Sequence, residues 1–291
     1  MIESDSTLKE KVKTLLEESL FCINNDEVFL HPAVIGDCVK SLIGTDLENP
    51  YIDLLDWLGG EVEKSDKKEA SKPSKPIEAQ TTSYKQLQEA LVLKDKLLIE
   101  DILTRLSLLT DGTQLIEVLI QMSLQQTGKS FTSIWRIYKI LNFIEVKDRL
   151  HSYKAMCDFI LKDDFREDSF IKDEISHEEV FHISDDYFNI VIFSHILDCK
   201  NHSFIRKDEL LLALNNMMSY IGTNKGKNTL EIHEKSMQKD RGIVLNKIRS
   251  DSLTLSRKNI LILDCIRMLI KNSPTINDKI IDFMYKQLKS S

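Results

Sequence analysis

The sequence predicts an all-α protein in which a small N-terminal helical module is tethered to an α-solenoid-like or irregular helical bundle. Apolar residues recur at the three- and four-residue spacing of helices along most of the chain, and period-two alternation nowhere extends over more than a few residues. The chain has only 9 glycines and 5 prolines in 291 residues. Because glycine serves tight turns and phosphate-binding loops, this composition disfavours sandwiches, barrels and nucleotide-binding α/β enzymes.

Residues 1–62 are expected to form the small module from three short helices. Pro32 and Pro50 each stand where a first helical residue belongs, and so mark the second and third helices. Gly59 and Gly60 are expected to end the third helix. A unit of about 60 residues has a marginal core, which makes it a candidate for docking on the body or on a partner. The first helix has apolar residues at helical spacing, namely Leu8, Val12, Leu15, Leu16 and Leu20.

Residues 63–83 are expected to form a flexible linker. Ile77 is their only large hydrophobe, and Lys, Ser, Glu and Pro dominate the segment. Such a segment buries too little apolar surface to offset the entropy that it would lose on ordering. It separates the small module from the helical body, residues 84–291.

The helical body is expected to be a succession of helices. The first two helix pairs begin at Leu87 and Ser130, 43 residues apart, and this separation lies within the range of two-helix repeats. Residues 188–193 are apolar nearly all round, which is typical of a central buried helix. A short strand is expected near residues 180–183. Apolar stripes predict helices at residues 87–109, 115–122, 131–141, 150–160, 188–193, 210–221, 230–248, 260–270 and 276–288.

Charge divides unevenly along the chain. The basic part, residues 200–291, contains 17 basic and 9 acidic residues, a formal charge of +8. Residues 1–199 contain 22 basic and 37 acidic residues, a formal charge of −15. The acidic segment, residues 163–186, has ten carboxylates against Arg166 and Lys172. Separation of charge on this scale creates a surface field that steers partners.

Gly128-Lys129-Ser130 matches the last three positions of a phosphate-binding loop, but Ser123 stands where that loop needs its first glycine. A helix, rather than the required strand, is expected before the segment. The sequence therefore predicts that Gly128 ends one helix and that Ser130 caps the next.

His195, Cys199 and His202 would bring metal-ligating side chains to one side of a continuous helix, with His177 or His182 as a further ligand. The alternative is that His195 and Cys199 are ordinary core and helix-end residues of a strongly apolar helix. Because no paired Cys-x-x-Cys supports a site, we expect neither a metal nor a cofactor.

The apolar and acidic residues at positions 51–58 follow a pattern that predicts an amphipathic helical turn immediately before the linker. Its apolar side chains, Ile52, Leu55, Trp57 and Leu58, are candidate partner-binding residues. The alternative is that these side chains close the core of the small module.

The basic part of the chain offers a candidate basic patch that could meet nucleic acid. No dense arginine block or glycine-aromatic RNA signature accompanies it. The acidic segment, in this chain or another, is an alternative partner for the patch. Its residues are Arg241, Lys247, Arg249, Arg257 and Lys258.

These patterns predict a non-enzymatic interaction subunit or adaptor of a larger intracellular multiprotein complex, of signalosome-, proteasome-lid- or kinetochore-like character. No Gly-x-Ser-x-Gly elbow or comparable nucleophile motif occurs in the sequence, so we expect no catalytic residue. Other protein subunits are the expected partners. The alternative is a nucleic-acid-associated helical module that uses the basic part.

Location is predicted from three features. The 5 cysteines are an odd number at wide spacing, which suits a reducing compartment. Residues 1–5 lack the basic and apolar regions of a secretory signal. No apolar run approaches the roughly 18 residues that span a bilayer. We therefore expect an intracellular protein, cytoplasmic and/or nuclear, without membrane insertion.

Overall fold

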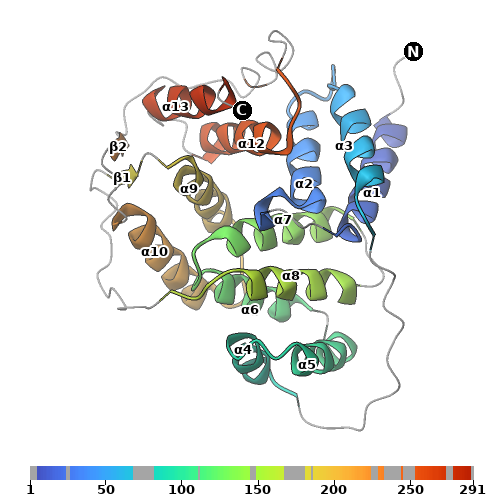
Figure 1. Cartoon of the computed structure of the whole chain (residues 1–291), viewed down its shortest axis with the longest axis vertical. Helices are drawn as coiled ribbons and strands as arrows, with labels where there is room; N and C mark the ends of the chain where they lie inside the picture. Colours follow the sequence, from blue (N-terminus) through green and yellow to red (C-terminus); the bar gives the residue numbers. More distant parts are fainter. Residues whose placement is uncertain are drawn as a thin grey trace. The chain divides into compact units, whose positions relative to one another are not determined.

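The computed structural model describes residues 5–23, 27–67, 82–110, 112–144, 149–166, 181–184, 186–223, 229–232, 244, 253–272 and 278–289. Within these residues the chain is mostly helical, so the predicted all-α fold class is confirmed (Figure 1). None of the described helices combines the length and the apolar run that crossing a bilayer requires. The elements are α1 (Asp5–Leu20), η1 (Val28–Leu30), α2 (Pro32–Ile43), α3 (Asp53–Lys64), α4 (Tyr84–Val92), α5 (Lys96–Leu109), α6 (Thr113–Ser123), α7 (Lys129–Phe143), α8 (Leu150–Lys162), β1 (Phe181–Ser184), α9 (Tyr187–Lys200), α10 (Lys207–Thr223), β2 (Thr229–Ile232), α12 (Arg257–Asn272) and α13 (Asp278–Lys289).

The chain folds into two compact units, each made from segments that are far apart in the sequence. Most of the predicted linker, residues 68–81, lies outside the described residues. The division into a small module, a linker and a body therefore stays a prediction. The first unit comprises residues 1–37, 59–167 and 204–210, and the second comprises residues 38–58, 168–203 and 211–291.

In the first unit, α4 to α8 pack on one another. α4 contacts α5, α6 contacts α7, α7 contacts α8, and α5 also contacts α8. Leu103, Phe131 and Trp135 are buried in the core that these contacts create. The N-terminal segment joins this core, because α1 contacts α8 and η1 contacts α7. His151 Nε2 lies 2.9 Å from the carbonyl oxygen of Leu20. Residues of the predicted small module thus touch helices of the predicted body.

In the second unit, α9 and α12 pack along each other, and α12 also contacts α13. α9 is buried on nearly all sides, as predicted for residues 188–193. α12 is buried along most of its length. Since a helix that is apolar all round must be covered on every side, these two helices form the core of their unit.

The strands β1 and β2 pair antiparallel, with Phe181 opposite Ile232. β1 agrees with the strand expected near residues 180–183. The helix predicted at residues 230–248 is wrong at its start, because residues 229–232 form β2. Pairing with β1 gives these backbone groups the hydrogen bonds that a helix would otherwise supply, and this tertiary contact outweighs local propensity.

The single helix predicted at residues 87–109 is in fact two helices, α4 and α5. Lys94 has a left-handed backbone, with φ of 55°, a conformation that ends helices. Asp95 then caps α5, its Oδ1 accepting a hydrogen bond from the backbone N–H of Leu98 at 3.1 Å. The turn brings α5 against α4.

The predicted end of the third helix at Gly59 and Gly60 is also wrong, since α3 continues to Lys64. A Cβ on Gly59 would lie 3.8 Å from Leu15 Cδ2, an ordinary van der Waals contact. Neither glycine has the left-handed backbone that ends a helix. Glycine without that backbone lowers helix propensity by about 1 kcal/mol, a cost that packing offsets.

Candidate protein-binding surface

The α4–α5 pair exposes a group of large apolar side chains. Leu97, Leu98, Leu108 and Leu109 lie on α5, and their exposed fractions run from 42% to 82%. Val92 and Leu93, at the turn between the two helices, are also more than half exposed. Scattered exposed leucines are normal on protein surfaces, whereas a cluster marks a site of association.

The geometry of α5 places its four exposed leucines on one stripe with two charged residues. At about 100° per residue, the six side chains fall within an arc of about 120°. The pair Leu97 and Leu98 lies about 16 Å from the pair Leu108 and Leu109 along the helix axis. We call this stripe the α5 leucine face: Leu97, Leu98, Asp101, Arg105, Leu108 and Leu109.

The other side of α5 explains why the α5 leucine face is accessible. Ile99, Ile102, Leu103 and Leu106 are buried, and α5 contacts α4 and α8. Those contacts cover one side of the helix and leave the four leucines of the α5 leucine face exposed.

Ion pairs add to the packing that holds α5 in place. Lys154 Nζ of α8 lies 2.5 Å from Glu100 Oε1 of α5. Lys94 Nζ, in the turn before α5, lies 3.6 Å from Asp164 Oδ1. Each exposed pair is weak by itself. Together with the buried side of α5, the pairs present the α5 leucine face on a regular, packed helix.

The centre of the α5 leucine face carries two opposite charges. Arg105 Nη2 lies 2.7 Å from Asp101 Oδ2, across the i, i+4 spacing of neighbours on a helix surface. The Asp101 side chain is 38% exposed and the Arg105 side chain 16%. The face thus has apolar ends and an ion pair between them.

None of the candidate residues from the sequence lies on the α5 leucine face. A signal was present, because α5 has eight leucine or isoleucine residues among its 14. That number is more than one buried side of a helix needs. Which of the eight become buried depends on the contacts of α5 with α4 and α8, and this is a tertiary property.

Of the four candidate partner-binding residues from the sequence, two are buried and two are accessible. Leu55 and Leu58 are buried, Ile52 is exposed and Trp57 is half-buried. The burial of Leu55 and Leu58 favours the alternative that they close a core. A role of these four residues in partner binding stays a prediction.

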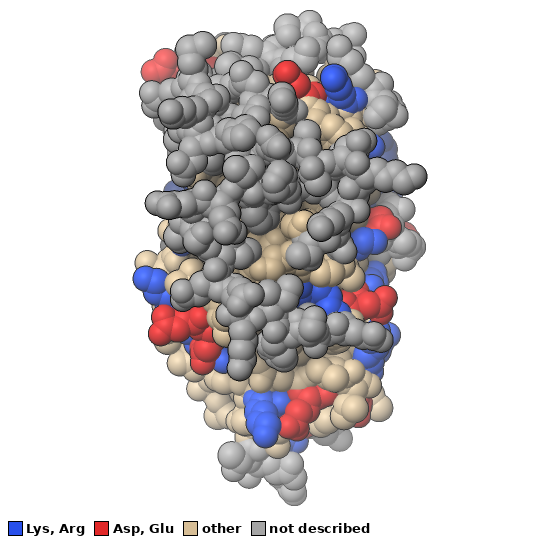
Figure 2. Space-filling view, turned by 90° about the vertical axis from the view of Figure 1, so that its left-hand side faces the viewer, with Lys and Arg blue, Asp and Glu red and all other residues tan. Residues whose placement is uncertain are grey.

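The candidate basic patch is only partly within the described residues. Arg257 and Lys258 begin α12, and Lys258 Nζ lies 5.0 Å from the ring centroid of Tyr187, within cation–π range. On the face shown in Figure 2, basic and acidic side chains of the described residues alternate across the surface. Three residues of the patch lie outside the described residues: Arg241, Lys247 and Arg249.

The three residues considered for a metal do not share one helix. His195 and Cys199 lie on α9, which ends at Lys200, so His202 falls beyond it. His195 Nδ1 donates to the carbonyl oxygen of Val191 at 2.7 Å, because a carbonyl can only accept. In the part of the chain that the structure describes, no group of three or more His, Cys, Asp or Glu is placed to hold a metal ion.

The thiol of Cys199 is buried. Burial raises the pKa of the Cys199 thiol well above its ordinary value, and Asp198 raises it further. A thiol with a raised pKa stays protonated, whereas metals bind thiolates. His177 lies outside the described residues, and only the backbone of His182 is described.

The Gly128-Lys129-Ser130 segment begins α7, with Gly128 as its N-cap in a left-handed conformation. Ser130 is therefore not the N-cap, contrary to the sequence prediction. Asp163 lies at this helix end instead, and its Oδ2 accepts from both the backbone N–H and the hydroxyl of Ser130 at 3.0 Å. The position where a helix N-terminus binds a phosphate thus holds the chain's own carboxylate.

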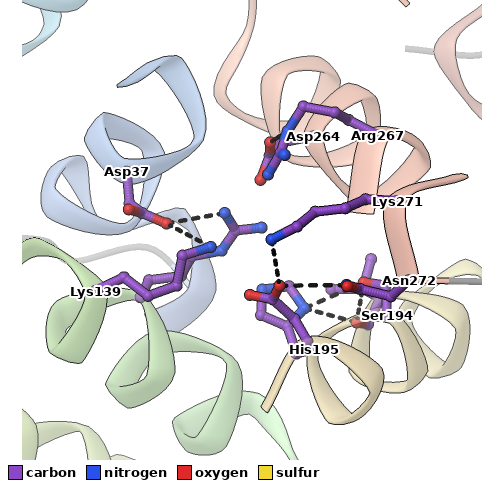
Figure 3. A network of polar contacts seen from close by, with 11 residues as sticks. Asp37, Lys139, Ser194, His195, Asp264, Arg267, Lys271 and Asn272 are labelled. Atoms are coloured by element: carbon purple, nitrogen blue, oxygen red, sulfur yellow. Dashed lines mark hydrogen bonds and ion pairs between the residues drawn. The ribbon is translucent and has the colours of Figure 1, made fainter. Parts of the chain in front are cut away.

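A buried charged group in the first unit centres on Asp37. Asp37 Oδ2 lies 3.0 Å from Arg136 Nη1 and 3.5 Å from Lys139 Nζ (Figure 3). The side chains of Asp37 and Arg136 are fully buried. Buried charges are tolerated when they are paired, so this group contributes to the core.

A separate buried group in the second unit centres on Asp198. Asn272 Nδ2 donates to Asp198 Oδ1 at 3.2 Å, and Lys271 Nζ lies 3.6 Å from the same oxygen. On α12, Arg267 Nε donates to Asp264 Oδ1 at 2.5 Å. Figure 3 shows Lys271 and Asn272 of α12 reaching toward α9, with Asp264 and Arg267 farther from α9. Asn272 and Lys271 thus link α12 to α9, whereas the Arg267–Asp264 pair lies within α12.

Comparison of the chain with protein-family models, with curated proteins and with solved structures found no match.

Proposed function

We propose that this protein is a non-enzymatic interaction subunit or adaptor of a larger intracellular multiprotein complex, in the cytoplasm or nucleus, and that it binds protein through the α5 leucine face. The observation that carries the proposal is the exposure of four leucines on one side of α5. Burying one leucine side chain contributes about 1.5–3 kcal/mol. Four of them in one stripe, two at each end, supply the apolar contact area that a protein interface needs.

The α5 leucine face defines the chemistry of its partner. A matching surface is a helix with two apolar groups about 16 Å apart. Between these groups it carries a basic side chain opposite Asp101 and an acidic one opposite Arg105. Such charges contribute direction and selectivity more than affinity.

The engagement of the buried carboxylates supports a non-enzymatic role. Asp37, Asp163 and Asp198 each bind side chains or backbone groups of this chain. Buried polar groups that satisfy one another stabilise a core. Carboxylates that are engaged in this way serve the fold, and this supports the proposal.

The proposed architecture is the predicted one, a small module tethered to a solenoid-like or irregular bundle. Contacts of α4 with α5, of α6 with α7 and of α7 with α8 support stacking of successive helices. Scaffolds of this kind bind partners through surfaces made by neighbouring helices.

Nucleic-acid binding by the basic part is the alternative, and no contact that the structure describes in that part favours it. Among the described residues of that part, Arg267 and Lys271 pair with Asp264 and Asp198. Cations that are neutralised within the fold contribute little to phosphate binding.

Affinity purification of the tagged full chain, with quantitative mass spectrometry, tests the proposal. We expect stoichiometric protein companions with the wild type and their loss with the double variant L97S/L108S. The matched control is L212S, which changes a leucine of α10 that is 60% exposed, and it should keep the companions. An unchanged melting temperature of L97S/L108S would show that the fold is intact. Recovery of the chain without companions, or equal loss with L212S, would contradict the proposal.

A further inference from the structure

We infer that the α5 leucine face binds the same face of a second copy of this chain, with the two α5 helices antiparallel across a two-fold axis. The inference rests on the proposed function, because it takes this face as a protein-binding surface. It goes further because it names the molecule that binds the α5 leucine face.

The symmetry of the face is the first argument. Asp101 and Arg105 lie two residues on either side of Leu103 in the sequence, Leu98 and Leu108 lie five, and Leu97 and Leu109 lie six. Reversing the helix direction therefore exchanges leucine with leucine and Asp101 with Arg105. A surface that is complementary to its own reversed copy is what a two-fold interface requires.

The spacing of the inner residues is the second argument. Leu98, Asp101, Arg105 and Leu108 follow one another at intervals of three, four and three residues, the seam spacing of helices that pack side by side. In an antiparallel pair, Leu98 of one copy packs beside Leu108 of the other, and this contact occurs twice. Leu97 and Leu109 flank the seam and extend its apolar area.

The two central charges set the direction. In the antiparallel pair, Asp101 of each copy faces Arg105 of the other, so the two ion pairs of the separate chains join into a group of alternating charge. In a parallel pair in register, Asp101 would face Asp101 and Arg105 would face Arg105. Like charges in such positions oppose association, so the antiparallel arrangement is favoured over the parallel one.

The composition of the adjoining linker argues against this linker as the occupant of the α5 leucine face. Residues 68–81, which precede α4, contain Ile77 as their only large hydrophobe. One apolar side chain cannot cover four leucines. The α5 leucine face of a second copy has four leucines to pack against these four.

The interface is small, since one helical stripe of each copy takes part. Interfaces at the low end of the size range are weak and transient. We therefore expect a reversible dimer whose dissociation constant lies in the micromolar range.

Charge-reversal variants of the full chain test the inference by sedimentation velocity over a range of concentrations. The wild type should shift from monomer to dimer as concentration rises. D101R and R105D each place four like charges at the centre of the pair, and each alone should associate more than about tenfold more weakly. An equimolar mixture of D101R and R105D should restore the dimer, because each arginine of one copy then faces an aspartate of the other. The double variant D101R/R105D should also dimerise.

L212S is the control and should dimerise like the wild type. A wild type that stays monomeric to high concentration, or a mixture of D101R and R105D that stays monomeric, would overturn the inference. If the wild type is monomeric while its companions are still lost with L97S/L108S, the second copy is wrong and the proposed function stands. If the dimer forms and no other protein is recovered, the homodimer stands and the adaptor role fails.

Discussion

The carboxylate of Asp163 lies at the N-terminus of α7, where its Oδ2 accepts hydrogen bonds from the backbone N–H and the hydroxyl of Ser130, both at 3.0 Å. Asp163 follows α8, so the end of one helix caps the beginning of another. Gln126 completes the link from the other direction, because its Nε2 donates to the carbonyl oxygen of Ile160 near the end of α8 at 2.7 Å. Asp163 thus supplies, across 33 residues, the side-chain acceptor that the N-cap residue Gly128 cannot provide.

We expect D163A to lower the free energy of unfolding by about 1–3 kcal/mol, because it leaves the buried backbone N–H of Ser130 without its acceptor. Urea unfolding followed by circular dichroism measures the loss. D164A is the matched control: the Asp164 side chain is 89% exposed and pairs with Lys94, so it should cost less than about 1 kcal/mol. Equal losses for the two variants would contradict the capping role.

D37A should destabilise the protein by about 3–5 kcal/mol, because it leaves Arg136 and Lys139 next to each other without the carboxylate that they share. The control is E18A, which removes an exposed pair with Lys67 and should cost less than about 1 kcal/mol. The double variant D37A/R136M should cost less than the sum of its single changes, because the two side chains interact. Additive losses would show that the pair is not coupled.

The stability of the protein should fall as pH rises from about 10 to about 12, in part through Tyr285. Burial raises the pKa of Tyr285 to about 12, with Asp282 contributing, whereas an unfolded tyrosine ionises near pH 10. In that window the unfolded chain releases a proton that the folded chain retains, which favours unfolding. The urea midpoint should fall less in Y285F than in the wild type. Y84F, the same change on α4, should behave like the wild type, and an identical fall in Y285F would refute this account.

The native thiols should resist alkylation at pH 8. All five cysteines are buried, and burial raises the pKa of Cys157 and Cys199, so the reactive thiolate is suppressed. A thiol-reactive dye should label no cysteine of the native protein in minutes and all five in denaturant. L98C should add one rapidly labelled thiol, since Leu98 is exposed. Rapid labelling of a wild-type cysteine would show that its burial is transient.

The helical character of the chain follows from short-range patterns of apolar residues, and these patterns are visible in the sequence. The spacing of Leu8, Val12 and Leu16 predicts α1, and the all-round apolar run at residues 188–193 predicts a buried helix, α9. Such patterns depend on side chains three or four positions apart, so the rest of the fold is not needed to read them.

The boundaries between helices and strands were harder to predict from the sequence. The break between α4 and α5 depends on the backbone of Lys94 and the cap by Asp95, inside a stripe that keeps its period. α3 passes through Gly59 and Gly60 because packing offsets a small local cost. Residues 229–232 are a strand because β1 is there to pair with them.

Composition and periodicity thus account for an all-helical chain with a polar segment between residues 63 and 83. Which side of α5 is exposed could not be read from the sequence, because the tertiary contacts of the helix decide it. Eight leucine and isoleucine side chains project from α5 in several directions. Only the contacts of α5 with α4 and α8 determine which four are buried and which four leucines remain exposed. The physical reason is that burial is a property of neighbours in space, and neighbours such as Asp163 and Ser130 are joined by the tertiary fold rather than by proximity along the chain.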